Sequence, residues 1–238
     1  MTLLVIETAT RAAAVGIAGD AGVVASARVG AGPRHGELLV PMVERLCAWS
    51  GVALSELEAV AVDAGPGLFT GLRVGASTAK ALGRSLDVPV VGISSLDALA
   101  WPVRHCTTLL ATVIDARRGQ VYWALHRGGA RIPGALGEDR VGPPEELAGE
   151  LSTLDEPCLA VGDGAERFGG VLSVVPSLGL AGRTEATPRV SVLAELARAA
   201  LAEGRGRPAA ELVPRYVRPP DARVGVGPSM GGRPGGGA

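Results

Sequence analysis

The sequence predicts an α/β protein of two related lobes, each a mixed β-sheet with helices packed against it. The first half has three strand patterns joined by short turns, and it then alternates helix and strand patterns. The second half repeats the order of strands, helix and strand more weakly. We place the boundary near residues 101–107, which gives a first lobe of residues 1–104 and a second, smaller lobe of residues 105–218.

Five strands and two long helices are expected in the first lobe. The apolar residues of His35–Trp49 recur at the spacing of an amphipathic helix, and Leu72–Leu86 has a helical pattern rich in small residues. The turn Gly19–Gly22 is typical of a β-hairpin, and a short helix is expected to start at Ser94–Ser95. The expected strands are Leu3–Ile6, Ala13–Ala18, Val23–Val29, Ala59–Val62 and Val88–Ile93.

The second lobe is expected to begin with two strands around the turn Asp115–Gly119. Pro143 and Pro144 are compatible with a helix start, because the first turn of a helix tolerates proline. The segment 219–238 is rich in Gly and Pro and has almost nothing to bury, so we expect a disordered tail. The expected strands are Thr108–Ile114, Gln120–Leu125 and Cys158–Val161, and the expected helices are Glu145–Leu151 and Val192–Ala202.

Composition excludes several classes of protein. The net charge of −1 gives no overall basic field that would attract nucleic acid over long range. The three cysteines form no C-x-x-C pair, which favours a reducing compartment and argues against structural zinc. No uncharged apolar stretch approaches the ~20 residues that span a bilayer, and Glu7 interrupts the first apolar run too early for an export signal. We expect a cytoplasmic protein without membrane contact.

The most informative segment is residues 63–75, which read Asp-Ala-Gly-Pro-Gly-Leu-Phe-Thr-Gly-Leu-Arg-Val-Gly. It joins a strand to a helix, and its glycines permit sharp turns and close approach of other backbone. We expect a turn at Pro66-Gly67 with a positive φ at Gly67, and Thr70 as the helix N-cap. The N–H groups near Gly71 would then face an anion. An ordinary strand–turn–helix corner is the competing interpretation.

Two places are candidates for phosphate handling. The first is the polar turn after the first strand, which could offer hydroxyls to phosphate and a carboxylate to magnesium, although an ordinary strand turn explains it equally well. The second is the glycine loop, where Asp63 could serve a cation or fix the turn by accepting backbone N–H bonds. The residues concerned are Glu7, Thr8 and Thr10 in the first place and Gly65, Gly67 and Thr70 in the second.

The sequence contains few residue patterns that would support nucleophilic or metal catalysis. The histidines, His35, His105 and His126, form no Ser/His/Asp pattern. The motifs G-x-S-x-G and G-K-[ST] are absent, which excludes a nucleophile elbow and a P-loop. We expect no catalytic residue and no metal site.

At this point the chain resembles the TsaB (YeaZ) family, the partner subunits of the bacterial machinery that makes N6-threonylcarbamoyladenosine (t6A) in tRNA. The matching segments are Gly65–Gly75 with Ala79–Leu82, joined by Ile6–Thr10, His35–Leu46, Ile114–Arg117, Val121–Tyr122 and Pro214–Arg218. They cover essentially the whole chain except the tail. The resemblance implies an actin-like, two-lobed fold of the sugar kinase/Hsp70/actin class. It also implies kinship with TsaD, the catalytic subunit that transfers the threonylcarbamoyl group to adenosine 37.

The departures from the catalytic relative argue that catalysis is lost. Where that subunit has two metal-binding histidines one helical turn apart, this chain has Ser95 and Leu99, and Leu99 cannot bind a metal. Where it opens its second lobe with a Ser-Gly-Gly turn, this chain has Asp115–Arg117, which adds bulk and a carboxylate. Its early strand ends in Asp, whereas this one ends in Glu7. The glycine loop and the first turn are therefore interpreted as vestigial, and no cofactor is expected, since ATP would be used by partner subunits.

The resemblance implies a scaffold that binds a TsaD-type subunit through the first-lobe helices and also contacts a TsaE-type ATPase. Contact with tRNA is expected only indirectly, and the exposed helix surface would also allow a homodimer when the partner is absent. A charge placed on a partner-facing residue, as in Leu39→Glu or Ser77→Arg, is expected to break the complex. The proposed interface consists of Leu38, Leu39, Met42, Val43 and Leu46 with Leu72, Val74, Ser77, Ala79 and Leu82.

Three other interpretations stay open. The runner-up is an active nucleotide-binding ATPase of the actin-like class that uses Glu7, Thr8 and Asp63. A metallopeptidase of the glycoprotease type is less favoured, because the histidine pair is missing. Arginines of the second lobe could also contact tRNA directly, although a solvated face explains them more simply. They are Arg117, Arg118, Arg127 and Arg131.

Overall fold

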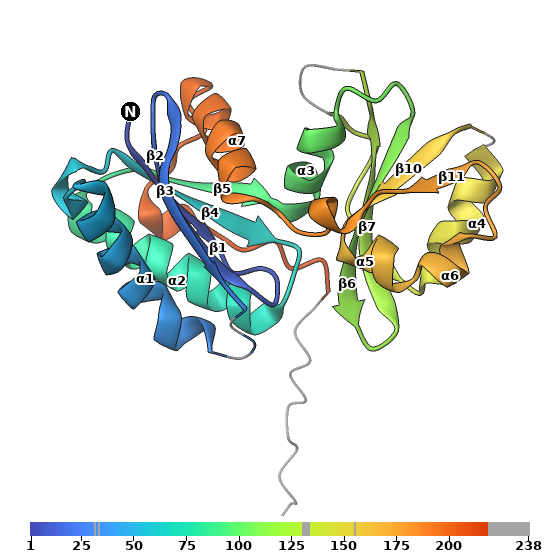
Figure 1. Ribbon diagram of the computed structural model, residues 1–238, viewed down its shortest axis with the longest axis horizontal. Helices are drawn as coiled ribbons and strands as arrows, with labels where there is room; N and C mark the ends of the chain where they lie inside the picture. The colour runs from blue at the N-terminus through green and yellow to red at the C-terminus, as the bar shows by residue number, and fades with distance from the viewer. Residues whose placement is uncertain (31, 33, 130–133, 155, 219–238) are drawn as a thin grey trace, which may run out of the picture.

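The structure, a computed structural model, describes residues 1–30, 32, 34–129, 134–154 and 156–218. They form two lobes, each built on its own sheet (Figure 1). The two-lobed α/β architecture predicted from the sequence is confirmed. The tail 219–238 and Arg131 lie outside the described residues. Among the described residues, no helix combines the length and the apolar character needed to cross a membrane.

The first lobe has a five-stranded sheet in the order β3-β2-β1-β4-β5. The first three strands are antiparallel neighbours, and β4 and β5 run parallel to β1. Parallel pairs require crossover connections, and α2 (Phe69–Leu86) supplies the one between β4 and β5. The strands are β1 (Leu3–Glu7), β2 (Ala13–Gly19), β3 (Gly22–Val29), β4 (Ala59–Gly65) and β5 (Val90–Ser94).

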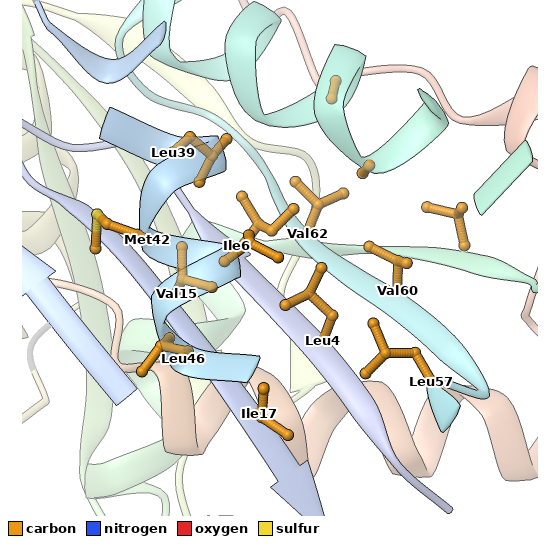
Figure 2. Close-up of a cluster of buried hydrophobic side chains, with 14 of the residues drawn as sticks. Leu4, Ile6, Val15, Ile17, Leu39, Met42, Leu46, Leu57, Val60 and Val62 are labelled. Atoms are coloured by element: carbon orange, nitrogen blue, oxygen red, sulfur yellow. The ribbon is translucent and has the colours of Figure 1, made fainter. Parts of the chain in front are cut away.

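Helices cover both faces of this sheet, because successive side chains of a strand point to opposite faces. On one face, Leu4 and Ile6 pack with α1 (His35–Ser50) and α2 (Phe69–Leu86). Figure 2 shows this cluster, with side chains of α1 pointing onto β1 and β2. On the other face, Leu3 and Val5 pack against α7 (Val190–Ala202). The first sheet therefore has an apolar layer on each face. Helices α1 and α2 cover one layer, and α7 covers the other.

The second lobe has a sheet in the order β11-β10-β6-β7-β8, with β9 also paired to β7. One face packs against α4, α5 and α6, and the other carries the short helix α3 (Ser95–Ala100) from the first lobe. The strands are β6 (Leu109–Arg117), β7 (Gln120–Arg127), β8 (Gly134–Ala135), β9 (Arg140–Gly142), β10 (Cys158–Val161) and β11 (Leu178–Leu180), and the helices are α4 (Pro144–Leu154), α5 (Asp163–Arg167) and α6 (Gly169–Leu172).

The domain boundaries need one correction. Helix α7 (Val190–Ala202), which we placed in a second lobe of residues 105–218, packs on the first sheet, where its Leu193 is fully buried. The chain thus returns to the first lobe after β11, and the expected first lobe of residues 1–104 lacks the helix that covers one of its faces (Figure 1). Amphipathic spacing shows that a helix buries one face but not which sheet it covers.

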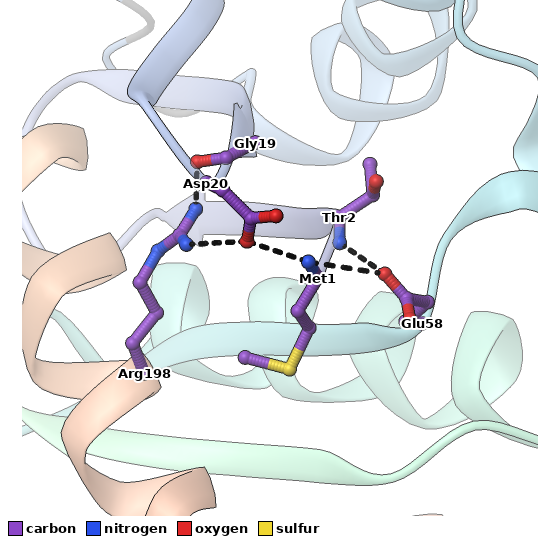
Figure 3. A network of polar contacts seen from close by, with 6 residues as sticks. All are labelled: Met1, Thr2, Gly19, Asp20, Glu58 and Arg198. Carbon is purple, nitrogen blue, oxygen red and sulfur yellow. Dashed lines mark hydrogen bonds and ion pairs between the residues drawn. The ribbon is translucent and has the colours of Figure 1, made fainter.

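Polar contacts at the edge of the first lobe also hold α7 there. Arg198 of α7 donates to the carbonyl of Gly19 and pairs with Asp20 at 3.4 Å. Asp20 in turn accepts from the amino group of Met1 at 2.6 Å, and Glu58 lies 3.5 Å from that same group (Figure 3). These groups are largely exposed, so the network fixes position more than it adds stability.

Replacement of Leu193 by Ala should destabilise the first lobe by about 2–5 kcal/mol, because a fully buried leucine leaves a cavity in the layer against β1 and β4. Leu180→Ala is the control, since Leu180 is 46% exposed in the second lobe. Urea unfolding measures the loss, and amide exchange should accelerate in β1 and not in β10. Faster exchange in β10 alone would contradict the placement of α7.

Candidate functional site

The N-terminus of α2 lies directly against the turn between β1 and β2, residues 8–12. A Cβ atom added at Gly67 would lie under 3.0 Å from the carbonyl oxygen of Ala9, and one added at Gly71 or Gly75 would come as close to atoms of Thr8. Real side chains do not reach such distances, so only glycine fits at these three positions. The N–H of Leu68 donates to the carbonyl of Ala9 at 2.7 Å. The glycine motif therefore brings a helix onto a strand turn.

Two local predictions for this loop are wrong. The left-handed residue is Gly65, with φ 99°, and not Gly67. Helix α2 starts at Phe69, one residue before Thr70, and its N-cap Leu68 makes no side-chain capping bond. At Gly67 the physical reason is the turn between β1 and β2, because Ala9 lies directly against this glycine.

The turn between β1 and β2 is closed by its own hydrogen bonds. The hydroxyl of Thr8 donates to the carbonyl of Gly71 at 2.8 Å. The backbone N–H of Thr10 donates to the Glu7 carboxyl at 3.0 Å, and the Thr10 hydroxyl donates to the same group at 3.2 Å. His35 of α1 adds a further contact from its Nε2 to the carbonyl of Thr10 at 3.0 Å. Glu7, Thr8 and Thr10 are all buried, so these groups are engaged inside the protein.

Two buried carboxyl groups, Glu7 and Asp63, lie at the ends of neighbouring parallel strands. Burial raises the pKa of Glu7 to about 8, and the nearby Asp63 adds to the rise. Burial also raises the pKa of Asp63 to about 6, although hydrogen bonds from Ser95 and Gly65 oppose it. Asp63 Oδ1 accepts from the N–H of Gly65 at 2.9 Å and from the hydroxyl of Ser95, so it fixes the turn. Its Oδ2 atom is buried and has no hydrogen-bond partner among the described residues.

Ser95 and Leu99, the two residues compared in the sequence with a pair of metal-binding histidines, are both engaged within the protein. The Ser95 hydroxyl is used by Asp63, and Leu99 is buried in the apolar cluster that joins α3 to the second sheet. The described residues contain no group of three or more His, Cys, Asp or Glu side chains placed to hold a metal ion.

The turn between β6 and β7 is held by Asp115. Its carboxylate accepts from the Arg117 backbone N–H and from the guanidinium groups of Arg117 and Arg167, each at 2.9 Å. Arg117 and Arg118 both adopt positive φ values, 64° and 55°. The carboxylate expected here from the sequence therefore neutralises two cations of the protein. Arg127, another arginine of the second lobe, is paired with Glu156 at 2.6 Å.

The ten residues proposed as a partner interface separate into two sets. Six of them are buried within the chain itself, which excludes them as exposed contacts: Leu39, Met42, Val43, Leu46, Leu72 and Ala79. The other four lie at the surface, with Ser77 exposed and Leu38, Val74 and Leu82 partly buried. The sequence reasoning missed Val40, which is 51% exposed on α1. In the sequence, Val40 could have been recognised as an apolar residue that lies outside the apolar stripe of that helix.

The chain is similar to known proteins over most of its length. The family model for TsaD, described as tRNA N6-adenosine threonylcarbamoyltransferase, matches residues 23–155. The TsaB protein of Bacillus subtilis, named a tRNA threonylcarbamoyladenosine biosynthesis protein, is 30% identical over 94% of this chain and 97% of its own length. An uncharacterized protein of Mycobacterium leprae is 43% identical over 61% of this chain, which is 40% of that protein. The solved structure of YeaZ from Pseudomonas aeruginosa has a TM-score of 0.77 and 30% identity, and covers 90% of this chain and 99% of that one.

Gly71→Ala should destabilise the protein by about 1–3 kcal/mol, because the added Cβ atom collides with the backbone of Thr8 and backbone cannot rotate away. Urea unfolding measures the change. Gly149→Ala is the matched control in another helix, where the Cβ atom meets open space and alanine is favoured by up to ~1 kcal/mol. Equal effects of the two substitutions would show that α2 does not depend on this close approach.

Glu7→Gln should stabilise the protein at pH 8 by an amount on the order of a few kcal/mol and flatten its pH dependence. The pKa of Glu7 is raised from 4.5 to about 8 in the folded chain, so the unfolded chain releases this proton first. Stability of the native protein therefore falls as the pH rises from about 4.5 to 8. Thermal unfolding at intervals across this range measures the effect. A native protein that is as stable at pH 8 as at pH 5 would contradict the protonated state of Glu7.

Proposed function

Because the chain belongs to the TsaB (YeaZ) family, we propose that it is a non-catalytic subunit that binds a TsaD-type catalytic subunit and supports threonylcarbamoyl transfer to adenosine 37 of tRNA. The observation that carries this proposal is the contrast between two parts of the first lobe. The turn that would handle phosphate is closed, whereas the outer face of α1 and α2 leaves apolar side chains exposed.

The use of the polar groups supports the proposal that the chain is not catalytic. Catalytic groups must be free to contact substrate, but Glu7 and Thr10 bond to each other and Thr8 bonds to α2. In this proposal the chain is a scaffold, and its partner subunits use ATP while this chain does not.

The proposed interface is the outer face of α1 and α2, which lie side by side on one face of the first sheet (Figure 1). It is defined by Val40, Trp49, Ser77 and the partly buried Leu38, Val74 and Leu82. Trp49 is 68% exposed, with the guanidinium of Arg45 5.8 Å from its ring centre. Exposed aromatic and aliphatic groups of this kind are typical anchors of protein interfaces.

This helix face also fits the other proposed partners. A TsaE-type ATPase would bear on the same helices when they form a bundle with the catalytic subunit. A homodimer would bury the same face when that subunit is absent. Contact with tRNA is proposed to be indirect, through the catalytic subunit.

Val40→Glu and Ser77→Arg should each abolish co-elution with the TsaD-type subunit encoded by the same genome, because a charge would be buried in the proposed interface. Both residues are exposed in the free chain, so the variants should unfold at the temperature of the native protein. Leu154→Glu is the matched control, since Leu154 is 41% exposed on α4 of the second lobe. Leu39→Glu cannot serve as a test, because Leu39 is buried in the core and the charge would unfold the chain.

The same variants test the function in a reconstitution. The other subunits should form t6A in tRNA at least tenfold faster with the native chain or Leu154→Glu than without it. Val40→Glu and Ser77→Arg should restore little activity, and the chain alone should form no t6A. Turnover of ATP by the isolated chain would overturn the non-catalytic assignment, and variants that still co-elute would overturn the interface.

A further inference from the structure

The outermost strand of the first sheet, β3, has a neighbouring strand on one side only. It pairs with β2, and within the described residues no hydrogen bond joins its backbone to any other segment. Such an edge presents unpaired N–H and C=O groups, and proteins usually shorten it, bend it or cover it. Strand β3 is 8 residues long, and beyond a register shift opposite Ile17 and Ala18 its pairing is regular from Ala25 to Val29. This regular stretch is therefore open to another strand.

The register of the sheet shows which backbone groups of β3 point outward. Along a strand, the N–H and C=O groups of successive residues point to alternate sides. The carbonyl of Thr2 accepts from the N–H of Glu58 at the start of β4, so the groups of Val5 point to the other side and bond to β2. Val5 lies opposite Gly16, and Gly16 lies opposite Ser26. Because the groups of Gly16 bond to β1, those of Ser26 have no partner on β2 and point outward.

Arg28 is in the same situation as Ser26. It lies opposite Ala14, which bonds to β1 as Gly16 does. Ser26 and Arg28 thus each offer one N–H donor and one C=O acceptor along the free edge. Their side chains lie on the face of the sheet that α7 covers, since Ala14 packs in the cluster with α7, and both residues are exposed. The free edge defined by Ser26 and Arg28 is therefore accessible.

A groove borders this free edge on the same face. Its volume is about 440 Å³, and its walls are β3 and the segment that leads into α7, residues 183–191. Val190, at the start of α7, lies so close to Gly16 of β2 that a Cβ atom added at Gly16 would come under 3.0 Å from its side chain. The second wall is therefore held against β2, and it leaves the edge of β3 uncovered.

Arginine side chains give this groove its charge. Arg28, Arg183 and Arg189 line it, and no acidic residue does so within the described part of the chain. Two of these arginines are neutralised from outside the groove, because Arg183 pairs with Glu166 at 2.6 Å and Arg189 pairs with Glu185 at 2.8 Å. The third arginine decides the charge of the groove.

Arg28 has a neutral partner. Its guanidinium donates to the hydroxyl of Thr187 at 3.3 Å, and among the described residues no carboxylate forms an ion pair with it. A guanidinium held in this way keeps its charge and its other donors for a ligand. The groove therefore has one unneutralised cation, and this cation belongs to a residue of the free edge.

The chemistry of this surface favours an extended acidic peptide over two other occupants. A strand edge pairs with the amide groups of a peptide. RNA has no such groups, and no aromatic side chain of the described residues lines the groove for bases to stack on. A second copy of β3 would bring another Arg28, its one charged residue, to a groove that is already positive. A peptide with carboxylates supplies both the backbone groups and the opposite charge.

We propose that the free edge of β3 binds an extended, acidic segment of a partner protein as an added strand, with Arg28 paired to one of its carboxylates. The backbone groups of Ser26 and Arg28 supply the hydrogen bonds, and alternate side chains of the segment point into the groove. The surface uses none of the residues on the outer face of α1 and α2. This inference goes beyond the proposed scaffold function and does not depend on it.

NMR titration of the isolated full chain tests the proposal with three probes. They are a hexapeptide of alternating glutamate and valine, the same peptide with lysine in place of glutamate, and a 5′-phosphorylated hexauridylate. The acidic peptide should bind, more weakly as salt rises, and amide exchange at Ser26 and Arg28 should slow in the complex. The lysine peptide should bind at least tenfold more weakly, because it brings like charge to Arg28.

Two substitutions on β3 separate the backbone from the charge. Ser26→Pro removes an outward N–H and leaves the pairing with β2, since edge strands tolerate proline where the N–H faces solvent. It should weaken binding of the acidic peptide at least tenfold, whereas Ser26→Ala keeps the N–H and should bind as the native chain does. Arg28→Glu should also weaken binding at least tenfold. Its control is Arg84→Glu, because Arg84 is exposed on α2 and does not line the groove.

Four results would overturn the proposal. These are no binding of the acidic peptide at millimolar concentration, equal binding of the lysine peptide, tighter binding of the hexauridylate, or equal binding by Ser26→Pro and Ser26→Ala. Thermal unfolding checks that the variants fold. If Ser26→Pro does not, unchanged exchange at Ser26 and Arg28 of the native chain with bound peptide overturns the proposal instead. Since no partner subunit is present, failure of the scaffold function would leave these results unchanged.

Discussion

The close contact between the start of α2 and the turn after β1 is the constraint on which the rest of the first lobe depends. Gly67 and Gly71 admit the backbone of Ala9 and Thr8, and Gly75 admits the Thr8 hydroxyl, at distances that a Cβ atom would prevent. That contact fixes where α2 crosses the sheet, and α1 is held to the same turn through His35. The exposed face of the two helices is therefore positioned by a buried backbone contact beneath it.

The same contact explains the unusual chemistry of the buried carboxyl groups. Once α2 covers the turn, Glu7 is separated from water and keeps its proton at neutral pH, since burial penalises the charged form. Asp63 is covered as well and accepts bonds from Ser95 and Gly65. Two carboxyl groups that look suited to a metal in the sequence are thus structural in the fold, and they make the lobe less stable as the pH rises.

The sequence predicted the longer strands and helices, because their alternation and amphipathic spacing directly reflect burial. It did not predict the short strands β8, β9 and β11 or the short helices α5 and α6. It could not place α7, since a helix with one apolar face packs equally well on either sheet in a sequence-based argument. The sequence-based interface included Leu39, which is buried, and omitted Val40, which is exposed. The reason is that the apolar stripe that predicts a helix also marks the face that the helix buries. For the candidate site, the sequence identified the residues but not their conformation. Thr8 and Gly71 were both singled out, but only the fold shows that they bond to each other.

The closed turn shows how packing removes a possible site for an anion. A turn binds phosphate with backbone N–H groups, which must then be free, and here the Leu68 N–H donates to Ala9 instead. The two lobes are held together by other means. The segment from Leu212 to Arg218 connects them, because it is anchored in the cores of both lobes and in the turn between β6 and β7. The arrangement of the lobes therefore depends on packing within the chain itself.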